Sequence, residues 1–164
     1  MTKFLLSVHV LAALLAIGPV AVAASMFPRT LRHAYGEAPE ASDAFGTLRL
    51  LHRICRVYAG IGVAVPIFGF ATASSLGVLG DAWLITSIVL TGAAAAILAL
   101  AILPAQNGVL VAAENGAPTA AENGGSAIDA RAAGRLAMLT GVFNLLWATV
   151  TVLMIVRPGS TTGA

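Results

Sequence analysis

Four long apolar stretches dominate this chain and constrain its fold more than any other feature. Each stretch is close to the ~20 residues that a helix needs to cross ~30 Å of hydrocarbon. No water is available inside a bilayer to satisfy peptide groups, so each stretch must close its backbone hydrogen bonds within itself as a helix. The sequence therefore predicts an all-α, polytopic membrane protein, a four-transmembrane-helix bundle with spans at about 4–25, 54–73, 82–103 and 136–156.

The composition favours a single integral membrane domain over residues 1–164. Hydrophobic residues make up 59% of the chain and charged residues 10%, whereas roughly 25% of an ordinary soluble domain is charged. The net charge of +2 comes from arginines beside the apolar stretches, which indicates contact with anionic membrane lipids and no nucleic acid. The single cysteine, Cys55, excludes an internal disulfide and a zinc site built from paired cysteines.

The positive charges predict the orientation of the spans. Seven of the nine lysines and arginines lie in the connections at about 28–53 and 105–134 or within three residues of them, and only Lys3 and Arg157 lie on the other side. Under the positive-inside rule both connections are cytoplasmic linkers, so both termini face the extracytoplasmic side, although Lys3 opposes this bias. The alternative, a cleaved signal peptide, fits less well because the first stretch exceeds the usual ~7–15 apolar residues of such a signal.

The second span has a predicted basic cytoplasmic extension. A helix is expected to begin near Ser42 or Asp43 and to run unbroken into the span, with a bend at Pro66. Three arginines on this extension are spaced at i, i+4 and i+7, which places them on one face of a helix, with a histidine beside them. They form a basic stripe that consists of Arg49, His52, Arg53 and Arg56. The stripe is expected to contact lipid head groups, and the alternative is docking of an acidic partner.

His9 is the strongest candidate for a functional residue because ionisable side chains inside a membrane are costly. Met154 lies at a similar depth in the fourth span. If the first and last spans are neighbours, His9 and Met154 can flank a haem b iron or a copper ion, since imidazole and thioether are known ligands of both. The competing interpretation is a neutral histidine that bonds a serine, a threonine or a freed carbonyl of an adjacent helix.

Two further sets of residues have both a binding and a structural interpretation. Several side chains near the cytoplasmic ends of the spans carry donor atoms that suit Cu(I), namely Met26, His52, Cys55 and Met138. The alternative is that methionine and cysteine simply fill apolar space between the helices there. In the fourth span Thr140, Asn144 and Thr151 predict polar contacts between helices. No acidic residue lies within a span, and no phosphate loop or nucleophile motif is present, so we expect no enzyme.

Short segments of the chain resemble a known family. They are Lys-Phe-Leu-Leu-Ser-Val-His from Lys3, Met-Phe-Pro-Arg from Met26, Leu-Leu-His-Arg-Ile-Cys-Arg from Leu50 and Leu-Met-Ile-Val-Arg-Pro from Leu153. They resemble a bacterial family of four-helix integral membrane proteins of unknown function, which is distantly similar to copper-resistance D-like membrane proteins. The resemblance implies a multi-pass protein of the bacterial plasma membrane, with His9 matching the family's first-helix histidine. The related families often carry Trp-x-Gly-Gly after that histidine, whereas this chain has Ala-Ile-Gly-Pro from Ala16.

Three functions are consistent with these patterns. The leading hypothesis is a non-catalytic membrane protein that serves as a structural, accessory or oligomeric subunit, with itself or another membrane protein as partner. The first alternative is a haem- or copper-binding protein that uses His9 near the outer leaflet. The second alternative is a facilitative carrier or channel for a small solute.

Overall fold

The computed structural model describes residues 2–34, 41–115 and 126–159. Every regular element in these ranges is a helix. The elements in chain order are α1 (Thr2–Ala34), α2 (Ala41–Ile61), α3 (Ala64–Leu76), α4 (Ala82–Ile97), the π-helix η1 (Leu98–Ile102), α5 (Leu103–Glu114) and α6 (Ser126–Val156).

These elements join into four rods, each long and apolar enough to cross a membrane. The rods are Thr2–Ala34, Asp43–Leu76, Ala82–Glu114 and Ala130–Val156. Within the most apolar part of each rod only 11–17% of the residues are buried inside the chain. The predicted all-helical architecture with four long apolar helices is thus confirmed, and few residues in the most apolar part of each helix are buried.

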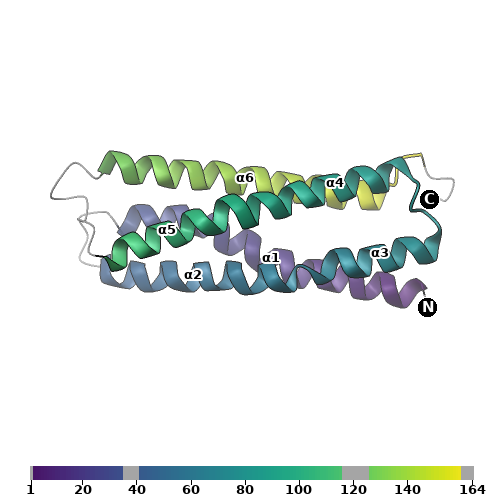
Figure 1. Ribbon diagram of the computed structural model, residues 1–164, viewed down its shortest axis with the longest axis horizontal. Coiled ribbons are helices and arrows are strands. Elements are labelled where there is room, and N and C mark those ends of the chain that lie inside the picture. Colours follow the sequence, from purple (N-terminus) through teal and green to yellow (C-terminus); the bar gives the residue numbers. More distant parts are fainter. Residues whose placement is uncertain (1, 35–40, 116–125, 160–164) are drawn as a thin grey trace.

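The four rods lie side by side along the long axis of the molecule (Figure 1). Helix α1 packs against α2, α3 and α6, while α4 packs mainly against α6 and α5 against α2. The beginning of α1, the end of α6 and the turn between α3 and α4 lie at one end of the bundle. The beginnings of α2 and α6 lie together at the opposite end (Figure 1).

The second rod is interrupted between α2 and α3, one turn before the predicted bend at Pro66. The N–H of Val63 donates to the carbonyl of Gly60 at 3.2 Å, and the N–H of Val65 donates to that of Gly62 at 3.1 Å. Each of these bonds joins residues three positions apart, whereas an α-helical bond joins residues four positions apart. Pro66 has no N–H to donate to the carbonyl of Gly62. The N–H of Val65 donates to this carbonyl instead, and the α-helix is interrupted at 62–63.

The predicted helix before the second apolar stretch is confirmed, since α2 runs without a break from Ala41 to Ile61. Helix also extends beyond the predicted ends of the other apolar stretches, at 28–34, 105–114 and 126–134. Hydropathy marks where an apolar stretch ends, but alanine- and leucine-rich sequence keeps a helix going beyond that point. Helix α2 begins at Ala41, just before the predicted cap residues Ser42 and Asp43.

The larger of the two described clusters of buried residues lies toward the end of the bundle that carries most of the arginines. Side chains from α1, α2, η1 and α6 meet in one cluster, whose most buried large members include Phe27, Leu48, Ile102 and Phe143. A second, smaller cluster at the other end contains Ala73, Trp83 and Leu84. The middle of the bundle, between these two clusters, is where the candidate site lies.

Candidate functional site

His9 is buried between α1 and α3 and is bonded to the neighbouring helix. Its Nδ1 atom lies 2.9 Å from the carbonyl oxygen of Val65. A carbonyl oxygen can only accept a hydrogen bond, so Nδ1 carries the proton, and in the neutral ring Nε2 keeps a free electron pair. The ring packs against Gly69, where an added Cβ would lie 3.0 Å from His9 Cε1. This geometry agrees with the structural interpretation of His9 and leaves Nε2 chemically able to bind a metal.

Met154 lies in different surroundings from His9. It packs against the cluster of Ala73, Trp83 and Leu84, and its carbonyl accepts a hydrogen bond from Arg157 Nε at 3.3 Å. No contact between Met154 and His9 is present among the described residues. A centre shared by these two side chains therefore stays a prediction.

Three residues that the sequence analysis did not single out as a group hold the end of the bundle near Met154. Trp83 donates its indole N–H to the Asp81 carboxylate at 2.9 Å. The guanidinium of Arg157 lies 5.7 Å from the centre of the Trp83 ring, within the range of a cation–π interaction. The contact joins Arg157, which directly follows the end of α6, to Trp83 in the first turn of α4. No spacing in the sequence predicts this contact.

His52 is buried, contrary to the expectation that it belongs to the basic stripe on α2. Its Nδ1 atom lies 3.1 Å from Gln106 Oε1, and the same amide donates from Nε2 to Cys55 Sγ at 3.8 Å. Gln106 on α5 is fully buried and was missed by sequence reasoning, because a single glutamine near a span end carries no signal. The three side chains form a polar link between α2 and α5 beneath the arginines.

The other expected donors of a Cu(I) site lie on the surface. Met26 is 48% exposed and Met138 is 63% exposed, so neither joins Cys55 and His52 in the interior. In the described part of the chain, no group of three or more histidine, cysteine, aspartate or glutamate residues is placed to hold a metal ion.

The arginines of the stripe, in contrast, share one exposed face. Arg49, Arg53 and Arg56 are all exposed on α2. Arg49 also reaches across to α5, where its Nη2 atom lies 3.3 Å from Glu114 Oε1. Both partners of this ion pair are well exposed, and such pairs add little to stability. Arg53 and Arg56 are exposed on the same face of α2.

The polar residues of α6 divide into two kinds. Thr140 donates to the carbonyl of Ala24 at 3.4 Å, and Asn144 Nδ2 donates to Ser25 Oγ at 3.1 Å, so both contact α1. Thr151 differs from the expectation, since it is exposed and donates to the carbonyl of Trp147 in its own helix at 2.9 Å. The reason is that Thr151 lies on the face of α6 turned away from the bundle.

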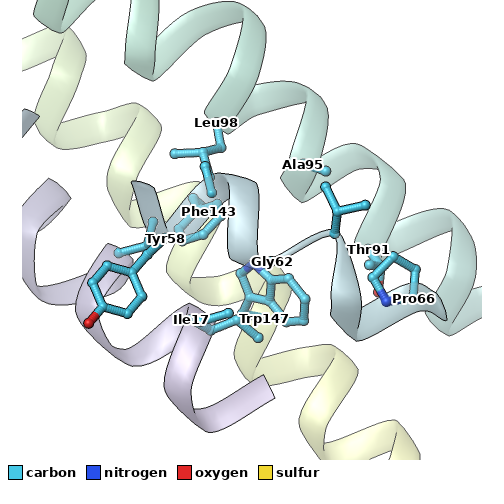
Figure 2. Close-up of a pocket in the computed structure, with 13 residues that line it drawn as sticks. Ile17, Tyr58, Gly62, Pro66, Thr91, Ala95, Leu98, Phe143 and Trp147 are labelled. Atoms are coloured by element: carbon cyan, nitrogen blue, oxygen red, sulfur yellow. The ribbon is translucent and has the colours of Figure 1, made fainter. Parts of the chain in front are cut away.

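A cavity of about 170 Å³ occupies the middle of the bundle, where the break between α2 and α3 faces α1, α4 and α6 (Figure 2). Its wall is almost entirely apolar, and the residues that line it are Ala16, Ile17, Val20, Tyr58, Ala59, Gly62, Val63, Pro66, Thr91, Ala95, Leu98, Phe143 and Trp147. Leu98 belongs to the π-helix η1. π-helical segments inside α-helices frequently mark functional sites, so two helix irregularities border the same space.

One polar atom in this wall lacks a partner. The indole Nε1 of Trp147 is buried and forms no hydrogen bond within the described part of the chain. Figure 2 shows the indole ring beside Ile17 and Gly62, with Phe143 on the same helix. An apolar cavity with few polar groups is the usual form of a small-molecule site in proteins.

Comparison with known proteins gives no relative of this chain. No family model, no curated protein and no solved structure matches it. Its candidate sites are therefore defined by the geometry described above.

Proposed function

We propose that this chain is an integral membrane protein whose four rods cross the bilayer, and that it acts without a catalytic centre as a subunit of a membrane assembly. The observation that carries the membrane part is the burial of only 11–17% of the most apolar window in each rod. In water, so much exposed apolar surface would cost roughly 25 cal/mol for each Å². Hydrocarbon removes that cost.

The exposed face of α4 supports the assembly part of the proposal. Gly92, Ala93 and Ala96 are all exposed on this face. Gly92 and Ala96 have the small-xxx-small spacing that lets transmembrane helices approach closely. A Cβ added at Gly92 would meet no atom within 4 Å, so a neighbouring chain has room to approach. We therefore assign this face to contact with a second copy of the chain.

Two experiments test the proposal. Alkaline carbonate extraction of membranes should leave the full chain in the pellet, and its release into the supernatant would contradict the membrane location. The mass of the purified protein in detergent should exceed that of one chain, and Gly92→Leu should shift it to one chain. Gly141→Leu is the matched control, because Gly141 is also exposed with open space around it, but on α6. A single-chain mass for the unaltered protein would contradict the assembly.

A second candidate function is metal or haem binding through His9, and the tautomer of His9 favours it. Histidines that bind metals commonly donate their other ring N–H to a backbone carbonyl, as His9 does to Val65. One such ligand fits, and the second predicted ligand, Met154, has no described contact with it. Absorption spectra and metal analysis of protein from cells supplied with haem and copper test this function. A haem band or bound copper that His9→Ala abolishes would support it, and colourless, metal-free protein would contradict it.

A further inference from the structure

One exposed strip of the second rod runs from the arginines to the central cavity. Its members are Arg49, Arg53, Arg56, Gly60 and Val63, and all five are exposed. Their spacing of i, i+4, i+7, i+11 and i+14 places them along one side of a helix. A Cβ added at Gly60 would meet no atom within 4 Å, so the chain leaves open space between the arginines and Val63.

The strip ends at a mouth of the cavity between the second and third rods. Val63 of the second rod is 60% exposed, Ala95 of the third rod is also exposed, and both line the cavity. Closer to the arginines α2 packs against α5, whereas α3 and α4 do not pack extensively against each other in the described part of the chain. Figure 2 shows Gly62 and Pro66 of one rod and Thr91 and Ala95 of the other around this space.

The two ends of this path differ in chemistry. Arg49 is paired with Glu114 at 3.3 Å, but Arg53 and Arg56 form no ion pair with any residue that the structure describes. An arginine guanidinium can bind phosphate oxygens through two parallel hydrogen bonds. No charged residue lines the cavity, whose wall is almost entirely apolar. An occupant of the whole path therefore needs an anionic head and an apolar tail.

We propose that an anionic phospholipid of the bilayer occupies this path, with its phosphate on Arg53 and Arg56 and one acyl chain in the cavity. The site depends on the membrane location proposed above. Seven residues separate Arg56 from Val63, which is about 10 Å at the rise of an α-helix. With Arg56 at the head groups, the mouth thus lies within the ~15 Å of hydrocarbon that one leaflet contributes. A cavity of about 150 Å³ holds benzene, so about 170 Å³ suits a chain segment of roughly six carbons.

Trp147 lines the cavity and reports whether an acyl chain is inside it, because bromine atoms on the chain quench tryptophan fluorescence on contact. The full chain is reconstituted in vesicles of equal amounts of phosphatidylglycerol and phosphatidylcholine, with bromine midway along the acyl chains of one lipid or of the other. We expect the site to prefer phosphatidylglycerol about five-fold, which corresponds to about 1 kcal/mol. Equal quenching by the two labelled lipids would overturn the proposal without any substitution in the chain.

Charge substitutions test the head-group contact. Arg53→Gln together with Arg56→Gln should bring the two lipids within about two-fold of each other. Arg131→Gln together with Arg135→Gln is the matched control, because both are exposed arginines on α6, and it should keep the preference. A preference that survives the loss of Arg53 and Arg56, or that falls equally in the control, would overturn the assignment, since the attraction would then come from general surface charge.

Filling the cavity tests the position of the acyl chain. Ala95→Leu places a larger apolar side chain at the mouth and should remove most of the extra quenching by brominated phosphatidylglycerol. Ala148→Leu, at an exposed position on α6 outside the cavity wall, should leave it unchanged. Trp83→Phe makes Trp147 the single tryptophan of the chain and should retain the effect. Extra quenching that persists in Ala95→Leu, or that disappears in Trp83→Phe, would overturn the placement of the acyl chain.

The outcome is separable from that of the proposed function. Failure of the membrane proposal appears in carbonate extraction, and failure of the assembly proposal appears in the mass of the detergent complex. Neither measurement depends on the choice of lipid head group. A protein that stays in the membrane pellet and is quenched equally by both labelled lipids would retain the proposed function and lose the lipid site.

Discussion

His9 on α1 and Val65 at the start of α3 are joined by a hydrogen bond of 2.9 Å between the imidazole Nδ1 and the backbone carbonyl. The bond links residues 56 positions apart in the sequence, and it lies next to the break in the second rod. The imidazole fits there because Gly69 has no side chain. The bond therefore sets how closely α1 and α3 approach each other.

Gly69→Ala should destabilise the protein because of this close approach. The new Cβ would lie 3.0 Å from His9 Cε1, and overpacking of this kind typically costs about 1–3 kcal/mol. Unfolding in mixed detergent and dodecyl sulfate, followed by circular dichroism, measures the loss. Gly60→Ala is the control, since a Cβ there meets nothing within 4 Å, and it should be neutral or slightly stabilising.

The destabilisation by Gly69→Ala should depend on His9. In a His9→Ala background the imidazole is gone, so Gly69→Ala should become neutral or gain up to about 1 kcal/mol from helix propensity. The same unfolding assay on the four variants gives the coupling energy. Equal losses with and without His9 would mean that the two residues do not interact.

Gln106→Leu should destabilise the link between α2 and α5 by about 1–3 kcal/mol, because it leaves the buried His52 without its partner. Replacing both residues, with His52→Phe and Gln106→Leu together, should recover part of the loss, since no buried polar group then lacks a partner. Thermal unfolding in detergent measures both effects. A double variant less stable than Gln106→Leu alone would argue against a shared role.

Asn144→Ala should cost about 0.6–2 kcal/mol, the usual range for a polar contact between helices in a membrane, because it removes the bond to Ser25. Thr151→Ala, on the outward face of the same helix, should leave stability unchanged within about 0.5 kcal/mol. Dodecyl sulfate titration of both variants makes the comparison. A larger loss for Thr151→Ala would indicate that its face is covered by another chain.

The predicted orientation can be checked with reporter fusions. Alkaline phosphatase joined after Pro158 should be active, because the C-terminus is expected on the extracytoplasmic side. The same enzyme joined after Glu114 should be inactive, since this point is expected in the cytoplasm. The opposite pattern would reverse the assigned topology while leaving the fold unchanged.

More of the fold than of the candidate site could be predicted from the sequence, and particular residues show why. The rod from Ala82 to Glu114 follows from local hydropathy, because a long apolar stretch has only one way to satisfy its backbone. The rotation of each helix about its axis depends on its neighbours. His52 and Arg53 are adjacent in the sequence, yet His52 is buried against Gln106 and Arg53 is exposed.

The sequence alone determined that this chain forms four apolar helices with all of its arginines except Arg157 gathered toward one end, because both properties are local and need no partner. Only the tertiary structure decided that Trp147, Thr91 and the break at Gly62 border one cavity, and that His9 bonds Val65. Those contacts join residues far apart in the chain. They depend on helix packing and on a displaced hydrogen bond before Pro66, neither of which hydropathy encodes.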